Sequence, residues 1–267
     1  MPVTLDCQLR KLSQAEFGDL AYEVMGHVFD IHRDFGPLFD EEIYQVELAR
    51  RIAGARIEVP IEVAFGGFRK TYYVDLLVDQ GAFFELKTVE TLHDRHRSQL
   101  LNYLLLTDTS HGKLVNLRPG SVEHEFVNTT LTLRDRTTFH VDDAIWDVVA
   151  PEISVLKDYV VGFLRDLGTG LDLSMYEEAI TYFLGGDEAV NKLIDVVVDG
   201  HVIGAQPMRC AALGVAFRLT TAPRSALPHF DEFLRRFVRH TTLECMLWIN
   251  ITRGLVTFRT FTSKPGR

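Results

Sequence analysis

Three short runs rich in β-branched and aromatic residues, all in the first third of the chain, limit the possible folds more than any other feature. The runs cover residues 57–65, 70–78 and 82–87, and the breaks between them contain Gly66-Gly67 and Asp79-Gln80-Gly81. Short glycine-containing breaks between such runs are typical of β-hairpins. We therefore expect an antiparallel meander of three strands.

Helical patterns lie on both sides of this meander. Ser13 and Glu16 have the spacing of a capping box, and apolar residues follow at helical intervals as far as Ile31. A second helix is expected at about 39–53, a third at about 92–106, and a short strand at 113–117. This alternation of helices and strands predicts an α/β domain.

A polar stretch at about 135–147 marks the expected boundary between two domains, 1–130 and 131–267. Behind it a long helical pattern runs from Ile153 to Gly168. The rest of the chain predicts helices at 175–184 and 230–239 and strands at 193–198, 204–220 and 254–262. The second domain is therefore also expected to be α/β.

Composition limits the functions that such a protein can have. The net charge of −9 argues against broad attraction to phosphate backbones, so any contact with nucleic acid must come from a local basic patch. No apolar run approaches the roughly 18 residues of a membrane-spanning helix, and the start lacks a signal-peptide pattern. The three cysteines have no metal-ligand spacing. We expect a cytoplasmic protein.

The second hairpin brings charged side chains together. If Gly81 takes the left-handed position of a three-residue loop, Val78 lies opposite Ala82. Counting outward then places Asp75 opposite Glu85, and alternate residues of a strand share a face. Lys87 lies two residues beyond Glu85, so this face carries two carboxylates and one ammonium.

Two adjacent carboxylates repel each other, and a hard cation such as Mg²⁺ removes that repulsion. The pattern therefore predicts metal-assisted phosphodiester hydrolysis, in which Lys87 stabilises developing negative charge. The alternative is an ordinary salt bridge of Lys87 on a solvated hairpin face. The helix that follows favours the site, because Gln99 and Tyr103 are four residues apart on one face, with His96 on the same stripe.

Together these residues resemble a known pattern. Asp75, Glu85-Leu86-Lys87 and Gln99 to Tyr103 resemble the PD-(D/E)XK nucleases, in the exonuclease-like branch that adds a QxxxY motif. The segment from Gly36 to Tyr44 resembles the GxxExxY signature of one family in that superfamily, with Leu38 in place of the first glycine. The resemblance implies a restriction-endonuclease-like mixed sheet flanked by helices, and a deoxyribonuclease that depends on Mg²⁺ or Mn²⁺.

The resemblance also implies roles for individual residues. Glu41, Asp75, Glu85 and the backbone carbonyl of Leu86 would bind the metal, Lys87 would be the catalytic lysine, and Gln99 and Tyr103 would position DNA or brace the site. By their place in the sequence, the candidates for DNA contact are Arg69, Lys70, Arg95, His96, Arg97 and Lys113. A solvated surface is the commoner explanation for such charges.

The C-terminal half contains weak echoes of the first half. Tyr176 echoes Tyr44, Ile194-Asp195 echoes Val74-Asp75, and Gly254-Leu-Val echoes Gly112-Lys-Leu-Val. In this register Leu173 replaces Glu41, residues 205–207 replace 85–87, and Thr241 and Cys245 replace Gln99 and Tyr103. The sequence leaves two interpretations open, a degenerate second copy without the metal ligands and a chance similarity between α/β segments.

Two other classes of function compete with the nuclease. The first is a catalytically inactive nuclease-fold module that binds DNA or a protein partner, which the acidic composition favours. The second is a small-molecule enzyme, for which the chain offers no glycine-rich phosphate loop. Formation of a homo-oligomer is compatible with the sequence.

Overall fold

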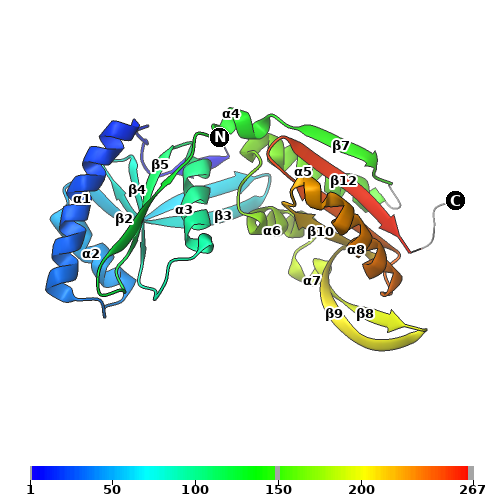
Figure 1. Ribbon diagram of the computed structural model, residues 1–267. Coiled ribbons are helices and arrows are strands. Elements are labelled where there is room, and N and C mark those ends of the chain that lie inside the picture. The colour runs from blue at the N-terminus through cyan, green and yellow to red at the C-terminus, as the bar shows by residue number, and fades with distance from the viewer. Residues whose placement is uncertain (1, 148–150, 264–267) are drawn as a thin grey trace. The chain divides into compact units, whose positions relative to one another are not determined.

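The computed structural model describes residues 2–147 and 151–263. The chain divides into two compact units, Met1–Leu133 and Arg134–Arg267. In its described part, each unit holds a six-stranded mixed sheet flanked by helices (Figure 1). The predicted fold class, α/β with mixed sheets flanked by helices, is confirmed. No helix of the described residues is both long and apolar enough to cross a membrane.

The first unit contains β1 (Val3–Leu5), α1 (Gln14–Phe35), α2 (Glu41–Arg51), β2 (Ala55–Phe65), β3 (Phe68–Val78), β4 (Ala82–Lys87), α3 (Asp94–Thr107), β5 (His111–Asn116) and β6 (Glu123–Asn128). Its strands lie in sequence order, β1 to β6. The pair β4–β5 is parallel and is connected by α3, whereas the other neighbours are antiparallel. The sequence patterns do not predict the short strands β1 and β6.

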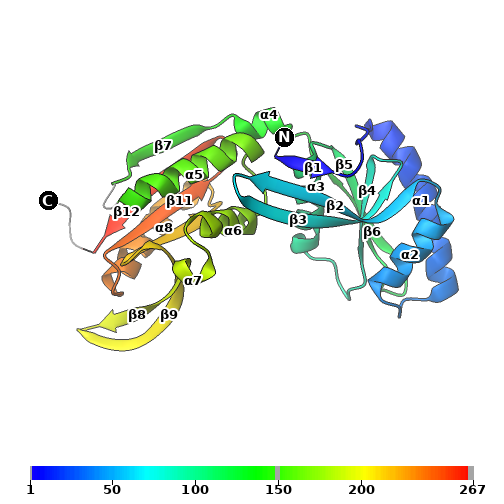
Figure 2. The same ribbon diagram turned by 180° about the vertical axis from the view of Figure 1, so that it is seen from behind.

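Helices cover both faces of this sheet (Figures 1 and 2). On one face, α1 and α2 pack on a core that includes Phe84 and Leu86 of β4. On the other face α3 packs closely, because a Cβ added at Gly112 of β5 would lie 3.0 Å from Leu100 of α3. Since side chains alternate along a strand, Glu85 and Lys87 point to the α3 face.

The predicted register of the second hairpin is confirmed, but its loop conformation is not. Val78 pairs with Ala82 as expected. The left-handed residues are Asp79 and Gln80, with φ of 50° and 56°, so the expectation that Gly81 takes this position is wrong. Glycine is needed at Gly81 for another reason, since a Cβ there would lie 2.7 Å from the backbone oxygen of Arg10.

The second unit contains α4 (Leu133–Thr137), β7 (His140–Ile145), α5 (Pro151–Leu167), α6 (Leu173–Phe183), α7 (Asp187–Val190), β8 (Asn191–Val198), β9 (His201–Ala212), β10 (Val215–Thr220), the 3₁₀ turn Arg224–Ala226, α8 (Leu227–Arg239), β11 (Cys245–Ile251) and β12 (Leu255–Thr262). The strand order is β7-β12-β11-β10-β9-β8. The pairs β10–β11 and β12–β7 are parallel.

Two strands of the second unit are absent from the sequence-based expectation for opposite reasons. Every residue of β11 is buried, so it lacks the polar alternation by which a strand is recognised. In contrast, β7 is an edge strand in which no residue is fully buried, and its two adjacent aspartates, Asp142 and Asp143, make its sequence typical of a linker. The expected single strand at 204–220 is the hairpin β9–β10, which turns at Leu213-Gly214.

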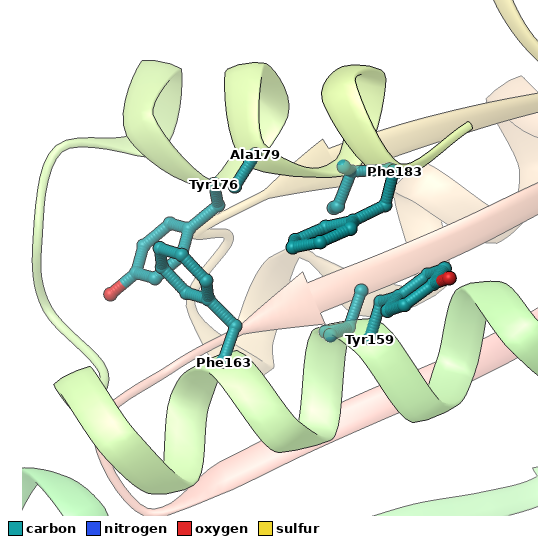
Figure 3. Close-up of a pocket in the computed structure, with 7 residues that line it drawn as sticks. Tyr159, Phe163, Tyr176, Ala179 and Phe183 are labelled. Atoms are coloured by element: carbon teal, nitrogen blue, oxygen red, sulfur yellow. The ribbon is translucent and has the colours of Figure 1, made fainter. Parts of the chain in front are cut away.

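A small pocket between α5 and α6 is a packing gap rather than a ligand site. It is lined by the aromatic rings of Tyr159, Phe163, Tyr176 and Phe183 (Figure 3). Tyr159 and Phe183 stack with their ring centroids 4.5 Å apart. The cavity volume of about 10 Å³ has room for one water molecule at most.

Candidate active site

Three carboxylates from separate elements of the first unit meet around one ammonium group. Asp75 comes from β3, Glu85 from β4 and Glu41 from the first turn of α2. The Lys87 Nζ atom lies 2.8 Å from Glu85 Oε1, 3.3 Å from Asp75 Oδ2 and 3.5 Å from Glu41 Oε1. The structure thus brings together all four side chains that the sequence singled out.

The backbone next to these side chains is also engaged. Pairing between β3 and β4 ends at Leu76 and Phe84, one step before Asp75 and Glu85. Beyond that step the Leu86 N–H donates to Asp75 Oδ2 at 2.7 Å, and Lys87 Nζ donates to the Leu86 carbonyl oxygen at 2.5 Å. The strand end therefore offers a side-chain acceptor and a main-chain carbonyl at the same place.

Glu41 is positioned by the turn between α1 and α2. Helix α1 ends at Gly36, whose φ of 73° is in the left-handed region where glycine is favoured. The hydroxyl of Tyr44, a completely buried residue of α2, donates to the Gly36 carbonyl oxygen at 2.5 Å. This bond fixes where α2 begins, so that the Glu41 carboxylate reaches the site from the first turn of the helix.

Burial and mutual repulsion change the protonation of these groups. Glu85 has no exposed surface, and its burial, followed by the charge of Asp75, raises its pKa to about 8. Burial is also the main reason that the pKa values of Asp75 and Glu41 are raised. Burial alone would lower the pKa of Lys87, but the nearby carboxylates of Glu85 and Asp75 outweigh it and raise that pKa. Lys87 is therefore charged at neutral pH.

Helix α3 supplies a second set of side chains near the carboxylates. Gln99 Nε2 donates to the Tyr103 hydroxyl at 2.9 Å. Burial, and after it the charge of Glu85, raises the pKa of Tyr103. His96 is buried at the start of the helix, where its Nδ1 accepts from the His93 N–H at 3.1 Å. The spacing of Gln99 and Tyr103 thus yields a bonded pair beside the site.

Residues 18–128 match the family model of the PD-(D/E)XK nuclease superfamily. The match runs from within α1 to the end of β6, and so includes all four converging side chains. It supports a nuclease-type function, the hydrolysis of phosphodiester bonds, for the first unit. No curated protein and no solved structure matches the chain in the corresponding searches.

Nucleases of this superfamily generally depend on divalent metal ions. Among the described residues, no group of three or more His, Cys, Asp and Glu side chains is arranged to hold an ion directly. In the site itself the Lys87 ammonium lies between the carboxylates. Both Glu85 oxygens are buried, and within the described residues their ion pair with Lys87 is the one polar contact they have. Such oxygen donors are the ligands that Mg²⁺ prefers.

The basic residues proposed for contact with nucleic acid differ in their availability. Arg69 and Arg95 are exposed, and Lys70 is half-buried with its Nζ 5.1 Å from the centre of the Tyr72 ring. Arg97 forms ion pairs with Asp94 at 2.7 Å and Glu125 at 2.6 Å. None of these positions excludes a contact with phosphate.

Lys113 is the exception among these basic residues. Its side chain is buried within β5, with Nζ 3.6 Å from the centre of the Phe126 ring. Burial also lowers its pKa. The prediction that Lys113 contacts DNA is therefore wrong for the structure as folded, because the ammonium is covered by the protein.

One acidic residue of the site was missed in the sequence. Glu58 of β2 lies across from Asp75, because its neighbours Ile57 and Val59 pair with Leu76 and Val74. Its φ of 49° is unusual for a residue that is not glycine, and such conformations cluster at functional sites. After burial, the Glu58 charge adds to the raised pKa of Asp75. If Gly66-Gly67 is taken as a two-residue hairpin loop, Phe65 pairs with Phe68 and the same register places Glu58 opposite Asp75, so the sequence did contain this signal.

Proposed function

We propose that the first unit is a divalent-metal-dependent deoxyribonuclease whose centre consists of Asp75, Glu85 and Lys87. The observation that carries the proposal is the convergence of three carboxylates on Lys87, with Glu85 buried and its oxygens bonded to nothing but that ammonium among the described residues. Burying several like charges is costly unless a counter-charge of matching chemistry is available. A bound hard cation would offset this cost, which explains why the carboxylates are kept together.

The metal ligands would be the carboxylates of Glu41, Asp75 and Glu85 and the carbonyl oxygen of Leu86. A bound Mg²⁺ or Mn²⁺ would polarise the phosphoryl group and lower the pKa of a water molecule. Lys87 is held in its charged form at the same place, and its ammonium would stabilise negative charge on the phosphoryl oxygens or orient the attacking water. The Lys87 ammonium would have to move away from the Leu86 carbonyl oxygen and the carboxylates, and these oxygens would then be available as metal ligands.

Two further motifs support a finer assignment within the superfamily. The bond from Tyr44 to Gly36 and the position of Glu41 favour the GxxExxY family. The bonded pair Gln99–Tyr103 favours the branch with a QxxxY motif. In this proposal the pair positions the DNA strand next to Glu85, and neither side chain takes part in proton transfer, because burial raises the pKa of Tyr103.

Nucleic acid would be bound by a local basic patch, since the whole chain carries a net charge of −9. The candidates that remain are Arg69 and Lys70 at the start of β3 and Arg95 and Arg97 at the start of α3. Replacing any one of these side chains by alanine should lower the slope of log affinity against log salt by about one, if that side chain neutralises a phosphate.

The test is a cleavage assay with the full chain on single-stranded DNA, double-stranded DNA and RNA, with Mg²⁺, Mn²⁺ or EDTA. We expect cleavage of DNA that EDTA abolishes, and a loss of about 100- to 1000-fold in rate for Lys87→Ala. Asp75→Asn should be inactive as well. Lys157→Ala, which removes an ammonium paired with Asp143 in the second unit, is the matched control and should keep full activity.

Two results would overturn the proposal. Cleavage that survives Lys87→Ala and Asp75→Asn would place the activity elsewhere or in a contaminant. Absence of cleavage by pure protein with either metal would instead favour the rival function, a catalytically inactive nuclease-fold module that binds DNA or a protein partner.

A further inference from the structure

The two units repeat one order of elements. The first runs α1-α2-β2-β3-β4-α3-β5-β6, and the second runs α5-α6-β8-β9-β10-α8-β11-β12, with only the short α7 and the 3₁₀ turn inserted. In each, three antiparallel strands are followed by a helix that leads into a parallel neighbour, β4 to β5 and β10 to β11. Shared topology alone is weak evidence of common origin.

A tyrosine bond at the second helix of each unit strengthens the comparison. Tyr44 donates to the Gly36 carbonyl oxygen at 2.5 Å, and Tyr176 donates to the Gly168 carbonyl oxygen at 2.8 Å. Both tyrosines are buried, and both glycines have positive φ, 73° and 82°. Figure 3 shows Tyr176 on α6, next to Phe163 of α5. In each unit the bond ties the second helix to the end of the first.

A buried asparagine repeats in the same way at the end of the parallel strand. Asn116 of β5 accepts from the Val89 N–H at 3.1 Å and donates to the Val89 carbonyl oxygen at 2.8 Å. Asn250 of β11 accepts from the Ala222 N–H at 2.7 Å and donates to the Ala222 carbonyl oxygen at 3.0 Å. Both partners lie two residues beyond the end of the preceding strand, β4 or β10.

These anchors fix which residues correspond. Glu85 and Arg218 are each the fourth residue of their strand, so Lys87 corresponds to Thr220. Extending the pairing of each hairpin places Asp75 opposite Glu85, one step beyond the pair Leu76–Phe84. In the same way it places Met208 opposite Arg218, two steps beyond the pair Cys210–Ala216, so Met208 is the counterpart of Asp75. The tyrosine bonds make Leu173 the counterpart of Glu41. Each of the three carboxylates around Lys87 thus has a counterpart that is not acidic.

The alignment of the two halves that the sequence suggested is shifted by one strand. Asp195 lies on β8, the first strand of the meander, so residues 205–207 do not correspond to Glu85-Leu86-Lys87. Likewise Thr241 and Cys245 lie beyond the end of α8, the helix that matches α3, so they do not correspond to Gln99 and Tyr103.

The second unit keeps a hollow where the first has its carboxylates. A cleft of about 440 Å³ is lined by Leu173, Met208 and Arg218, the replacements of Glu41, Asp75 and Glu85. Arg209 and Glu177 also line it and neutralise each other in an ion pair of 3.0 Å. Arg218 is exposed and has no hydrogen bond or ion pair with any described residue. Its guanidinium is free to meet a ligand.

The formal charge of the cluster changes sign between the units. Three carboxylates and one ammonium carry −2 in the first, whereas Leu173, Met208, Arg218 and Thr220 carry +1 in the second. Thr220 is held in the core, since it donates to Asn250 and accepts from Trp248. These four positions therefore attract an anion, and none of them supplies a carboxylate to a metal ion.

We propose that the second unit is a degenerate copy of the first, whose cleft binds the phosphodiester backbone of a nucleic acid strand through Arg218, without metal and without cleavage. The planar guanidinium presents paired N–H donors that match phosphate oxygens. Met208 and Leu173 are apolar where the first unit has metal-binding carboxylates, and the one carboxylate among the described residues that line the cleft, Glu177, is paired with Arg209. The choice of ligand rests on the proposed function of the first unit, because a diverged copy with a positive cleft suits the same polyanion.

The test is metal-free binding of fluorescein-labelled 20-nucleotide single strands and duplexes to the full chain in EDTA, at several salt concentrations, by fluorescence anisotropy. We expect Arg218→Ala to weaken binding about three- to tenfold and to lower the salt slope by about one, and Arg218→Lys to keep the slope. Arg239→Ala is the matched control, since Arg239 is exposed on α8 and does not line the cleft.

An unchanged affinity and slope for Arg218→Ala would overturn the inference, as would equal losses for Arg218→Ala and Arg239→Ala, which would indicate unspecific attraction. Thermal unfolding of each variant should match the wild type, because both arginines are exposed. Cleavage with Mn²⁺ is measured in parallel. Binding that depends on Arg218 in a protein that cleaves nothing refutes the proposed function alone, and cleavage without such binding refutes this inference alone.

Discussion

Glu85→Gln is expected to stabilise the metal-free first unit at alkaline pH. The wild-type carboxyl group has its pKa raised to about 8 by burial and by Asp75, whereas in the unfolded chain the value is about 4.5. A raised pKa in the folded state means that stability is complete below pH 4.5 and is lost as the pH rises through 8. Glutamine has the same shape and does not ionise, so the variant avoids this loss of stability at high pH.

The size of the effect follows from the shift. Each pKa unit corresponds to about 1.4 kcal/mol, so the shift sets an upper limit of about 5 kcal/mol. The variant also removes the partner 2.8 Å from Lys87, which stays charged throughout this range and loses part of its stabilisation. We therefore expect a net gain of about 2 kcal/mol at pH 8.5 and little difference at pH 4.5.

Hydrogen–deuterium exchange measured by mass spectrometry is the suitable assay. Both tryptophans, Trp146 and Trp248, belong to the second unit, so tryptophan fluorescence does not report on the first. The readout is the protection factor of the amides in β4, in EDTA, at pH 5 and pH 8.5, with β11 as internal reference. Added Mg²⁺ should narrow the difference between the two proteins by binding the wild type more tightly.

Equal protection of β4 in both proteins at pH 8.5, or lower protection in the variant, would refute the reasoning. Glu62→Gln, which neutralises an exposed carboxylate of strand β2 in the same sheet, is the matched control and should change protection by less than about 0.5 kcal/mol. A similar gain in that variant would point to the net charge of the chain rather than to the burial of Glu85.

Three further predictions concern the scaffold. Gly81→Ala should destabilise the first unit by about 1–3 kcal/mol in urea unfolding followed by circular dichroism, because its Cβ would lie 2.7 Å from the Arg10 oxygen; an unchanged midpoint would contradict the close contact. Asn116→Ala and Asn250→Ala should each cost about 2–4 kcal/mol in the same assay, since each removes the side-chain partner of a backbone N–H and C=O, those of the partly buried Val89 and the buried Ala222; a loss of stability in only one unit would argue against equivalent roles. Lys113→Met should leave DNA affinity unchanged and stability within about 1 kcal/mol, because the ammonium is already buried; a clear decrease in affinity would show that it reaches the ligand.

Most of the first unit could be predicted from local patterns in the chain. Alternating runs and glycine breaks define the β2–β3–β4 meander, since the period of side chains along a strand and the length of a hairpin loop leave little freedom in register. That register was enough to predict Asp75, Glu85 and Lys87 as one cluster. Local patterns succeed here because these three side chains lie within one hairpin.

Tertiary packing accounts for the features that those patterns miss. The burial of Lys113 depends on the cover that Phe126 of β6 gives its ammonium, and the approach of Glu41 depends on how α2 packs on the sheet; no spacing along the chain encodes either. Strand β11 could not be recognised in the sequence, because a fully buried strand lacks the alternation of apolar and polar residues. The proposed correspondence of Arg218 with Glu85 rests on matching hydrogen bonds, Tyr44 with Tyr176 and Asn116 with Asn250, and these bonds join segments that only the tertiary structure brings together.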